Sequence, residues 1–172
     1  PENTISLPKD VTESYKIIAN ALMFALQKIG VKAQIKQQPE KVATPICFNS
    51  QNWYELTVNE KKISGSAQRR LQGKILQHGP ILIDFDFEKN AILFNSHNAK
   101  DLACNLKKKI TSIKHELGID ISYKKMVDAI KYGFQKNFKM NFFDDTLTKE
   151  EIELSKKLRN EKYSLSSWNL RI

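Results

Sequence analysis

The sequence predicts an α+β domain in which helices pack against a mixed or antiparallel sheet. A helical pattern of apolar residues begins near Asp10, segments typical of strands follow between residues 31 and 86, and helical patterns return after residue 99. The chain has 172 residues and is rich in Leu, Ile, Val and Phe. Such a chain is long enough for one hydrophobic core, so we expect a single domain over 1–172.

The N-terminal part is predicted to be a helix followed by a short strand. Asp10 and Glu13 resemble a capping box, apolar residues recur behind them at helical spacing, and Gly30 is placed to end the helix. Residues 31–36 then alternate apolar and polar side chains, as a short strand does. The polar loop that follows leads to Cys47.

Paired strands joined by turns are predicted in the centre of the chain. The expected order is strand 53–58, turn 59–61, strand 62–70, turn 71–74 and strand 75–85. Alternation in the first of these strands places Trp53, Glu55 and Thr57 on one face and Tyr54, Leu56 and Val58 on the other. The last strand is expected to be largely buried.

Mainly helices are predicted after the sheet. The expected order is a surface crossover with a candidate strand at 87–98, a helix at 99–116, a helix at 122–137, a strand at 138–143, and a helix from Thr148 with Glu151 in its capping box. Gly118 is placed to stop the first of these helices.

Composition and cysteine usage limit the classes of partner and compartment. Lys and Arg total 28 against 19 Asp and Glu, a formal net charge of +9, which favours acidic proteins or polyanions as partners. Nucleic-acid-binding signatures are absent from the sequence, so we expect no nucleic-acid partner, and a generic basic nucleic-acid binder is the least favoured alternative. Cys47 and Cys104 lie far apart and lack CxxC spacing, which predicts a reducing, cytoplasmic environment and no metal site. No apolar run is long enough to span a membrane, so we expect no membrane association.

Four motifs carry a resemblance to a known family. CF at 47–48, WYELTV at 53–58, KKISGSAQRR at 61–70 and LQHGPILID at 76–84 closely resemble the lipoate and octanoyl transferases, which have a biotin/lipoate protein ligase-like catalytic domain. The resemblance is to the cysteine-dependent octanoyltransferase branch and runs from about Leu7 to the end of the chain. It implies the α+β fold of that family.

The resemblance also implies that part of the family domain is not in this chain. Members usually carry, upstream, further strands with a glycine-rich RRxxGGG motif that lines the acyl pocket, and the sequence lacks this motif. We therefore expect the chain to correspond to the C-terminal two thirds of a catalytic domain that lacks its usual N-terminal part. A longer protein or a second polypeptide would supply the rest.

The resemblance assigns roles to two residues. Cys47 matches the nucleophile of the octanoyltransferase branch, although a lone cysteine is more often a small buried hydrophobe, the interpretation that Cys104 keeps. Lys62 matches the family lysine that reaches the acyl carbonyl or, in ligases, the acyl-phosphate, where a fixed cation stabilises developing negative charge. The alternative for Lys62 is a solvated hairpin lysine like its neighbour Lys61.

Further residues are expected to bind the substrate. They are Gly65, Ser66, Ala67, Gln68, His78 and Gly79. The small residues would let an acyl chain or carrier arm lie against the backbone, and nearby amides would offer hydrogen bonds to an oxyanion. His78 could accept the proton from Cys47 or from an incoming amine, and a buried structural histidine is the alternative.

The leading hypothesis is an octanoyltransferase that needs no metal or nucleotide. It would move an octanoyl group from acyl carrier protein through a Cys47 thioester to a lysine of a lipoyl domain or of the glycine-cleavage H protein. Two alternatives stay open. One is a lipoate-protein ligase that uses ATP and Mg and does not need Cys47, and the other is a non-catalytic subunit that docks acidic carrier proteins through its lysine-rich helices.

Overall fold

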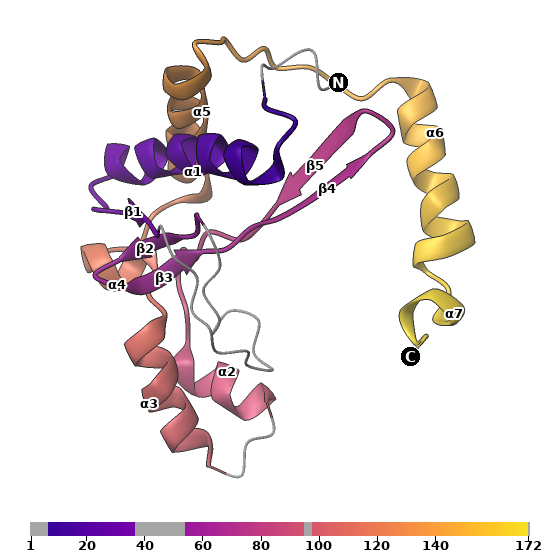
Figure 1. The fold of residues 1–172 in the computed structure, drawn as a ribbon. Helices are drawn as coiled ribbons and strands as arrows, with labels where there is room; N and C mark the ends of the chain where they lie inside the picture. The colour runs from indigo at the N-terminus through magenta and orange to yellow at the C-terminus, as the bar shows by residue number, and fades with distance from the viewer. Residues whose placement is uncertain (1–6, 37–53, 95–97, 172) are drawn as a thin grey trace. The chain divides into compact units, whose positions relative to one another are not determined.

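The computed structural model describes residues 7–36, 54–94 and 98–171 (Figure 1). Their contacts define two compact units, Pro1–Asn141 and Phe142–Ile172, and the prediction of a single domain over 1–172 stays a prediction. The first unit contains α1 (Val11–Lys28), β1 (Gln34–Ile35), β2 (Leu56–Val58), β3 (Lys61–Ser64), β4 (Ala67–Leu71), β5 (Lys74–His78), α2 (Phe87–Leu93), α3 (Ala99–Lys109), α4 (Ile113–Leu117) and α5 (Tyr123–Phe138). The predicted α+β class is confirmed.

The described strands form two antiparallel sheets. One sheet has the order β1-β2-β3, and the other is the β4–β5 hairpin, because the predicted strand 62–70 is interrupted at Gly65 and Ser66. Both predicted turns are confirmed. Asn59 and Glu60 have φ of 48° and 64°, and Gln72 and Gly73 have 51° and 67°, the left-handed pairs that two-residue hairpin loops require.

The main core lies between α1, α5 and the three-stranded sheet. Figure 1 shows α1 and α5 above this sheet and α2 and α3 below it. Leu26 of α1, Leu56 and Ile63 of the sheet and Ile113 of α4 are among its fully buried side chains. A smaller cluster around Leu106 joins α2 to α3. All three residues of β2 are buried, so the predicted division of its residues into two faces does not separate buried from exposed ones.

Gly133 sets how closely α1 and α5 approach each other. A Cβ at this position would lie 2.1 Å from the Ala21 carbonyl oxygen and 2.8 Å from the Ala25 nitrogen. We expect Gly133→Ala to lower the free energy of unfolding by about 3 kcal/mol, as overpacking forces the helices apart. Urea denaturation would measure this, with the exposed Gln135→Ala on the same helix as a control expected within about 0.5 kcal/mol of the parent. Equal stabilities would contradict the close crossing.

Three strand predictions are wrong, each for a physical reason. The strand expected at 75–85 ends at His78, and the hairpin is exposed or half-buried along its length because it projects from the sheet (Figure 1). The candidate strand in 87–98 is helix α2, whose first turn is capped by Asp86 accepting a hydrogen bond from the Lys89 amide at 2.9 Å. The segment 138–143 contains no strand, since Lys139 ends α5 in the left-handed conformation.

The helix predicted at 99–116 is divided into α3 and α4. Ile110 leaves the helix to pair with Lys62 in a parallel bridge, and the Thr111 amide donates to the Lys62 carbonyl at 2.9 Å. Ser112 then caps α4, which Gly118 ends with φ of 68°, as predicted. Pairing with a strand far away in the sequence thus overrides the helical pattern.

The second unit contains the predicted last helix. This is α6 (Lys149–Leu158), with the expected capping box of Thr148 and Glu151, followed by the π-helical η2 (Arg159–Tyr163) and α7 (Ser166–Asn169). The Tyr163 and Trp168 rings meet edge to face at 5.4 Å. None of the described helices in either unit is long and apolar enough to cross a membrane.

Candidate functional site

The site is built around a buried ion pair between β3 and the residue preceding β2. Lys62 Nζ lies 2.8 Å from Glu55 Oε1, and the two side chains are 3% and 4% exposed. The backbones of both residues are held by hydrogen bonds, since the Glu55 carbonyl accepts from the Lys36 amide and the Lys62 carbonyl from the Thr111 amide, each at 2.9 Å. Lys62 is therefore a buried, paired cation and not a solvated hairpin lysine.

Gly65 and Ser66 form the short irregular connection between β3 and β4, called the Gly65 turn below, and this connection lies directly on the ion pair. A Cβ at Gly65 would be 2.9 Å from Lys62 Cε, 3.2 Å from its Nζ and 3.4 Å from Glu55 Oε1. Gly79 covers the turn from the other side, where a Cβ would lie 1.9 Å from the Gly65 carbonyl oxygen. The absence of side chains at both glycines thus lets two backbone segments and the lysine amine come together.

Tyr15 of α1 supports the same turn. Its hydroxyl donates a hydrogen bond to the Ser66 carbonyl at 3.1 Å. Burial raises the pKa of this phenol, and the negative charge of Glu55 adds to the increase, whereas a hydrogen bond from the Gln68 backbone opposes it. The phenol therefore stays protonated over a wider pH range than usual and can keep donating its hydrogen bond to the Ser66 carbonyl.

Gln68 belongs to a structural network. Its Nε2 donates to Gln77 Oε1 at 2.8 Å, and its Oε1 accepts from Arg70 Nε at 3.0 Å. Arg70 also donates to the carbonyls of Lys9 at 2.7 Å and Pro8 at 2.8 Å and to Ser14 Oγ at 2.7 Å. The network joins the hairpin to the start of α1.

The predicted site residues do not all lie in one place. The structure brings together Lys62, Gly65, Ser66 and Gly79, whereas Ala67 and His78 pair across the hairpin and are exposed. The alternative of a buried structural histidine is therefore wrong for His78. Cys47 lies outside the described residues.

Two residues at this site were not predicted from the sequence. Alternation placed Glu55 on the same face as Thr57, and Thr57 pairs with Lys62 across the β2–β3 hairpin. The alternation was therefore only a partial signal for Glu55, because the β2–β3 register that brings it to the lysine is irregular between Leu56 and Thr57. Tyr15 offered no such signal, because it reads as one of several core positions on a helix 51 residues before Ser66.

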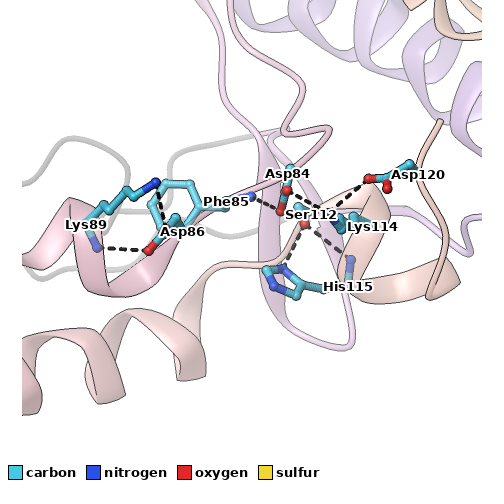
Figure 2. A network of polar contacts seen from close by, with 8 residues as sticks. All are labelled: Asp84, Phe85, Asp86, Lys89, Ser112, Lys114, His115 and Asp120. Atoms are coloured by element: carbon cyan, nitrogen blue, oxygen red, sulfur yellow. Dashed lines mark hydrogen bonds and ion pairs between the residues drawn. The ribbon is translucent and has the colours of Figure 1, made fainter. Parts of the chain in front are cut away.

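A second polar region lies where α2 and α4 begin and α3 ends. An open pocket of about 580 Å³ there is lined by residues including Asp84, Glu88, Lys107, Lys114 and His115. Lys114 Nζ pairs with Asp84 at 3.2 Å and with Asp120 at 3.0 Å (Figure 2). Lys107 pairs with Glu88 at 2.7 Å.

The hydrogen bond to Asp120, and after it the one to Asp84, raise the pKa of Lys114. The hydrogen bond from Lys114 in turn lowers the pKa of Asp84. Of the predicted site residues that the structure describes, none lines this pocket. Among the described residues, no group of three or more His, Cys, Asp or Glu side chains is arranged to hold a metal ion.

Fold and site together define the class of protein. Residues 2–135 match the family model described as the lipoyl protein ligase A/B catalytic domain, and the chain belongs to this family. The predicted family resemblance is thereby confirmed.

The most informative relatives are curated bacterial enzymes. The chain is 35% identical to octanoyltransferase LipM of Brevibacillus brevis over 99% of its length and 66% of the relative. It is 30% identical to octanoyltransferase LipM of Bacillus subtilis over 95% of its length and 63% of that protein. The chain thus spans slightly less than two thirds of these relatives.

Solved structures support the fold. A lipoate-protein ligase A bound with ATP superposes with a TM-score of 0.72 at 23% identity, over 93% of this chain and 59% of that one. The bipartite lipoate protein ligase of Thermoplasma acidophilum gives a TM-score of 0.73 at 22% identity, over 96% and 60% of the two chains. The predicted biotin/lipoate protein ligase-like fold is confirmed.

Proposed function

We propose that the chain is the catalytic part of an octanoyltransferase that uses acyl carrier protein as donor and a lipoyl domain or the glycine-cleavage H protein as acceptor. The observation that carries this proposal is the 35% identity to an octanoyltransferase over 99% of the chain. The buried Lys62 beneath a glycine turn supports it, because this is the place where the family resemblance predicts a cation for an acyl carbonyl.

In the first step, the Cys47 sulfur attacks the thioester carbonyl carbon of the octanoyl carrier. The carbonyl oxygen gains negative charge, which the Lys62 ammonium group and the amides of the Gly65 turn would stabilise. The bond to the carrier sulfur then breaks, the carrier thiol takes a proton, and octanoyl remains on Cys47. One thioester replaces another, so the exchange is close to isoenergetic and needs no nucleotide or metal.

In the second step, the acceptor lysine amine attacks the Cys47 thioester. An amide forms, the amine loses a proton, and the Cys47 thiol is restored. His78 is the candidate base for either proton, since it stands exposed at the end of β5 beside Gly79. The Cys47 nucleophile, the His78 base and the substrate contacts of Gly65, Ser66, Ala67, Gln68 and Gly79 are part of this proposal.

Intact-protein mass spectrometry tests the proposal. The chain is mixed with octanoyl acyl carrier protein without ATP, and any adduct is mapped by peptide digestion. We expect one octanoyl group on Cys47, none after Cys47→Ser, and an unchanged yield after Cys104→Ser, which removes the exposed thiol on α3. An adduct on Cys104 would contradict the proposal, and so would the absence of any adduct when the missing N-terminal part of the catalytic domain is also supplied.

Further measurements separate the remaining functions. An ATP-dependent ligase would modify a lipoyl domain in the presence of ATP and Mg and would tolerate Cys47→Ser. A docking subunit would bind the acidic carrier protein in a salt-sensitive manner without transferring octanoyl, through lysines such as those that end α3. The predicted second polypeptide would be recognised by transfer that begins only when it is added.

A further inference from the structure

We infer that Glu55 is the positioning residue for Lys62: it holds the lysine ammonium group against the Gly65 turn, where the proposed transfer needs a cation. This inference rests on the proposed function. It adds a residue to which the motif gives no role and which does not itself touch the substrate.

The first argument is burial. A lysine side chain has a flexible four-carbon stem and is normally solvated. Burying its ammonium group costs free energy unless the charge is paired. Lys62 is nevertheless 3% exposed, and the carboxylate 2.8 Å away is 4% exposed. At this distance and burial, the carboxylate restricts the direction in which the amine points.

The second argument is that Glu55 is itself held in place. Its carbonyl accepts from the Lys36 amide, and the next residue, Leu56, begins β2, so its backbone continues the β1–β2 ladder. The carboxylate also lies close enough to the Gly65 turn to meet a Cβ there at 3.4 Å. The turn, the amine and the carboxylate therefore form one packed group.

The third argument comes from Tyr15. Burial raises the pKa of its phenol, and the negative charge of Glu55 adds to the increase. The phenol in turn donates to the Ser66 carbonyl. Glu55 thus pairs with one residue that lies against this segment, Lys62, and acts electrostatically on another that holds it, Tyr15.

The test is a double-mutant cycle on the rate at which octanoyl acyl carrier protein acylates Cys47 in a single turnover. We expect Glu55→Gln to lower this rate about 10- to 100-fold, as loss of a supporting partner does at other sites. Glu55→Asp keeps the charge and is expected to stay closer to the parent. In a Lys62→Met background, Glu55→Gln is expected to have no further effect, because Glu55 acts through the lysine.

The double variant Glu55→Gln, Lys62→Met also keeps the test valid if Glu55→Gln alone folds poorly. It leaves no unpaired charge in the site, so we expect it to melt near the parent temperature while remaining as slow as Lys62→Met. An equal rate loss for Glu55→Gln in both backgrounds, or no loss in a folded Glu55→Gln, would overturn the inference.

Nuclear magnetic resonance separates this inference from the proposed function. The ¹H–¹⁵N signal of the Lys62 ammonium group, assigned by its loss in Lys62→Met, is expected to be visible in the parent because a paired buried amine exchanges slowly with water. It is expected to broaden away in Glu55→Gln. If the parent forms no Cys47 adduct but this signal behaves as expected, the proposed function fails and the positioning of Lys62 stands; a signal unaffected by Glu55→Gln would refute the positioning.

Discussion

Replacing Lys62 with methionine is expected to lower the free energy of unfolding by about 3–5 kcal/mol and to slow octanoyl transfer by about 10²–10³-fold. The stability loss arises because the 4%-exposed carboxylate of Glu55 would remain buried without the cation 2.8 Å away. Methionine has a similar length and keeps the packing, so the change isolates the charge. The rate loss follows if the ammonium group stabilises the oxyanion.

Chemical denaturation and single-turnover acylation would measure the two effects. The matched control is Lys61→Met, one residue earlier on β3, where the side chain is only half-buried. We expect the control to change stability by about 0.5 kcal/mol or less. A Lys62→Met protein as stable as this control would contradict the buried ion pair, and one that transfers octanoyl at the parent rate would remove Lys62 from the mechanism.

Replacing Gly79 with alanine is expected to displace the turn above Lys62. The new Cβ would lie 1.9 Å from the Gly65 carbonyl oxygen and 2.8 Å from Ser66 Cα, and these are backbone atoms that cannot rotate away. We expect the free energy of unfolding to fall by about 3 kcal/mol, which is at the upper end of the usual cost of overpacking. Transfer should fall further than stability accounts for, because the turn carries the proposed amide donors.

Gly73→Ala on the tip of the same hairpin is the control for Gly79→Ala. It meets no atom within 4 Å, but its φ of 67° makes alanine unfavourable by about 1 kcal/mol. Denaturation and acylation of the two variants, compared at a temperature where both are folded, separate backbone strain from steric overlap. If Gly79→Ala loses no more activity than Gly73→Ala, the close approach of Gly79 to the turn has no role in transfer.

Local chemistry made much of the fold predictable. Asp10 and Thr148 cap helices because their side chains accept a hydrogen bond from the backbone amide three residues later. Gly118 ends α4 because glycine adopts a positive φ without strain. The turn at 59–61 was recognisable because its residues interrupt the alternation of the strand before it. These features depend on residues within a few positions of one another.

The missed features depend on pairings between distant residues. Ile110 interrupts a helical pattern because it pairs with Lys62, 48 positions earlier. The ion pair of Glu55 with Lys62 requires the β2–β3 register, which includes an irregularity between Leu56 and Thr57. Apolar alternation at 75–85 could not reveal that the hairpin projects from the sheet and leaves Leu76 62% exposed.

Arg70 also bears on the order in which the chain folds. Its guanidinium group joins the hairpin to the carbonyls of Pro8 and Lys9, about sixty residues earlier. Closing a loop of this length costs conformational entropy before any contact repays it, so such contacts form late. The segment before α1 should therefore acquire its final position only after β4 and β5 have paired, although it is close to the N-terminal end of the chain.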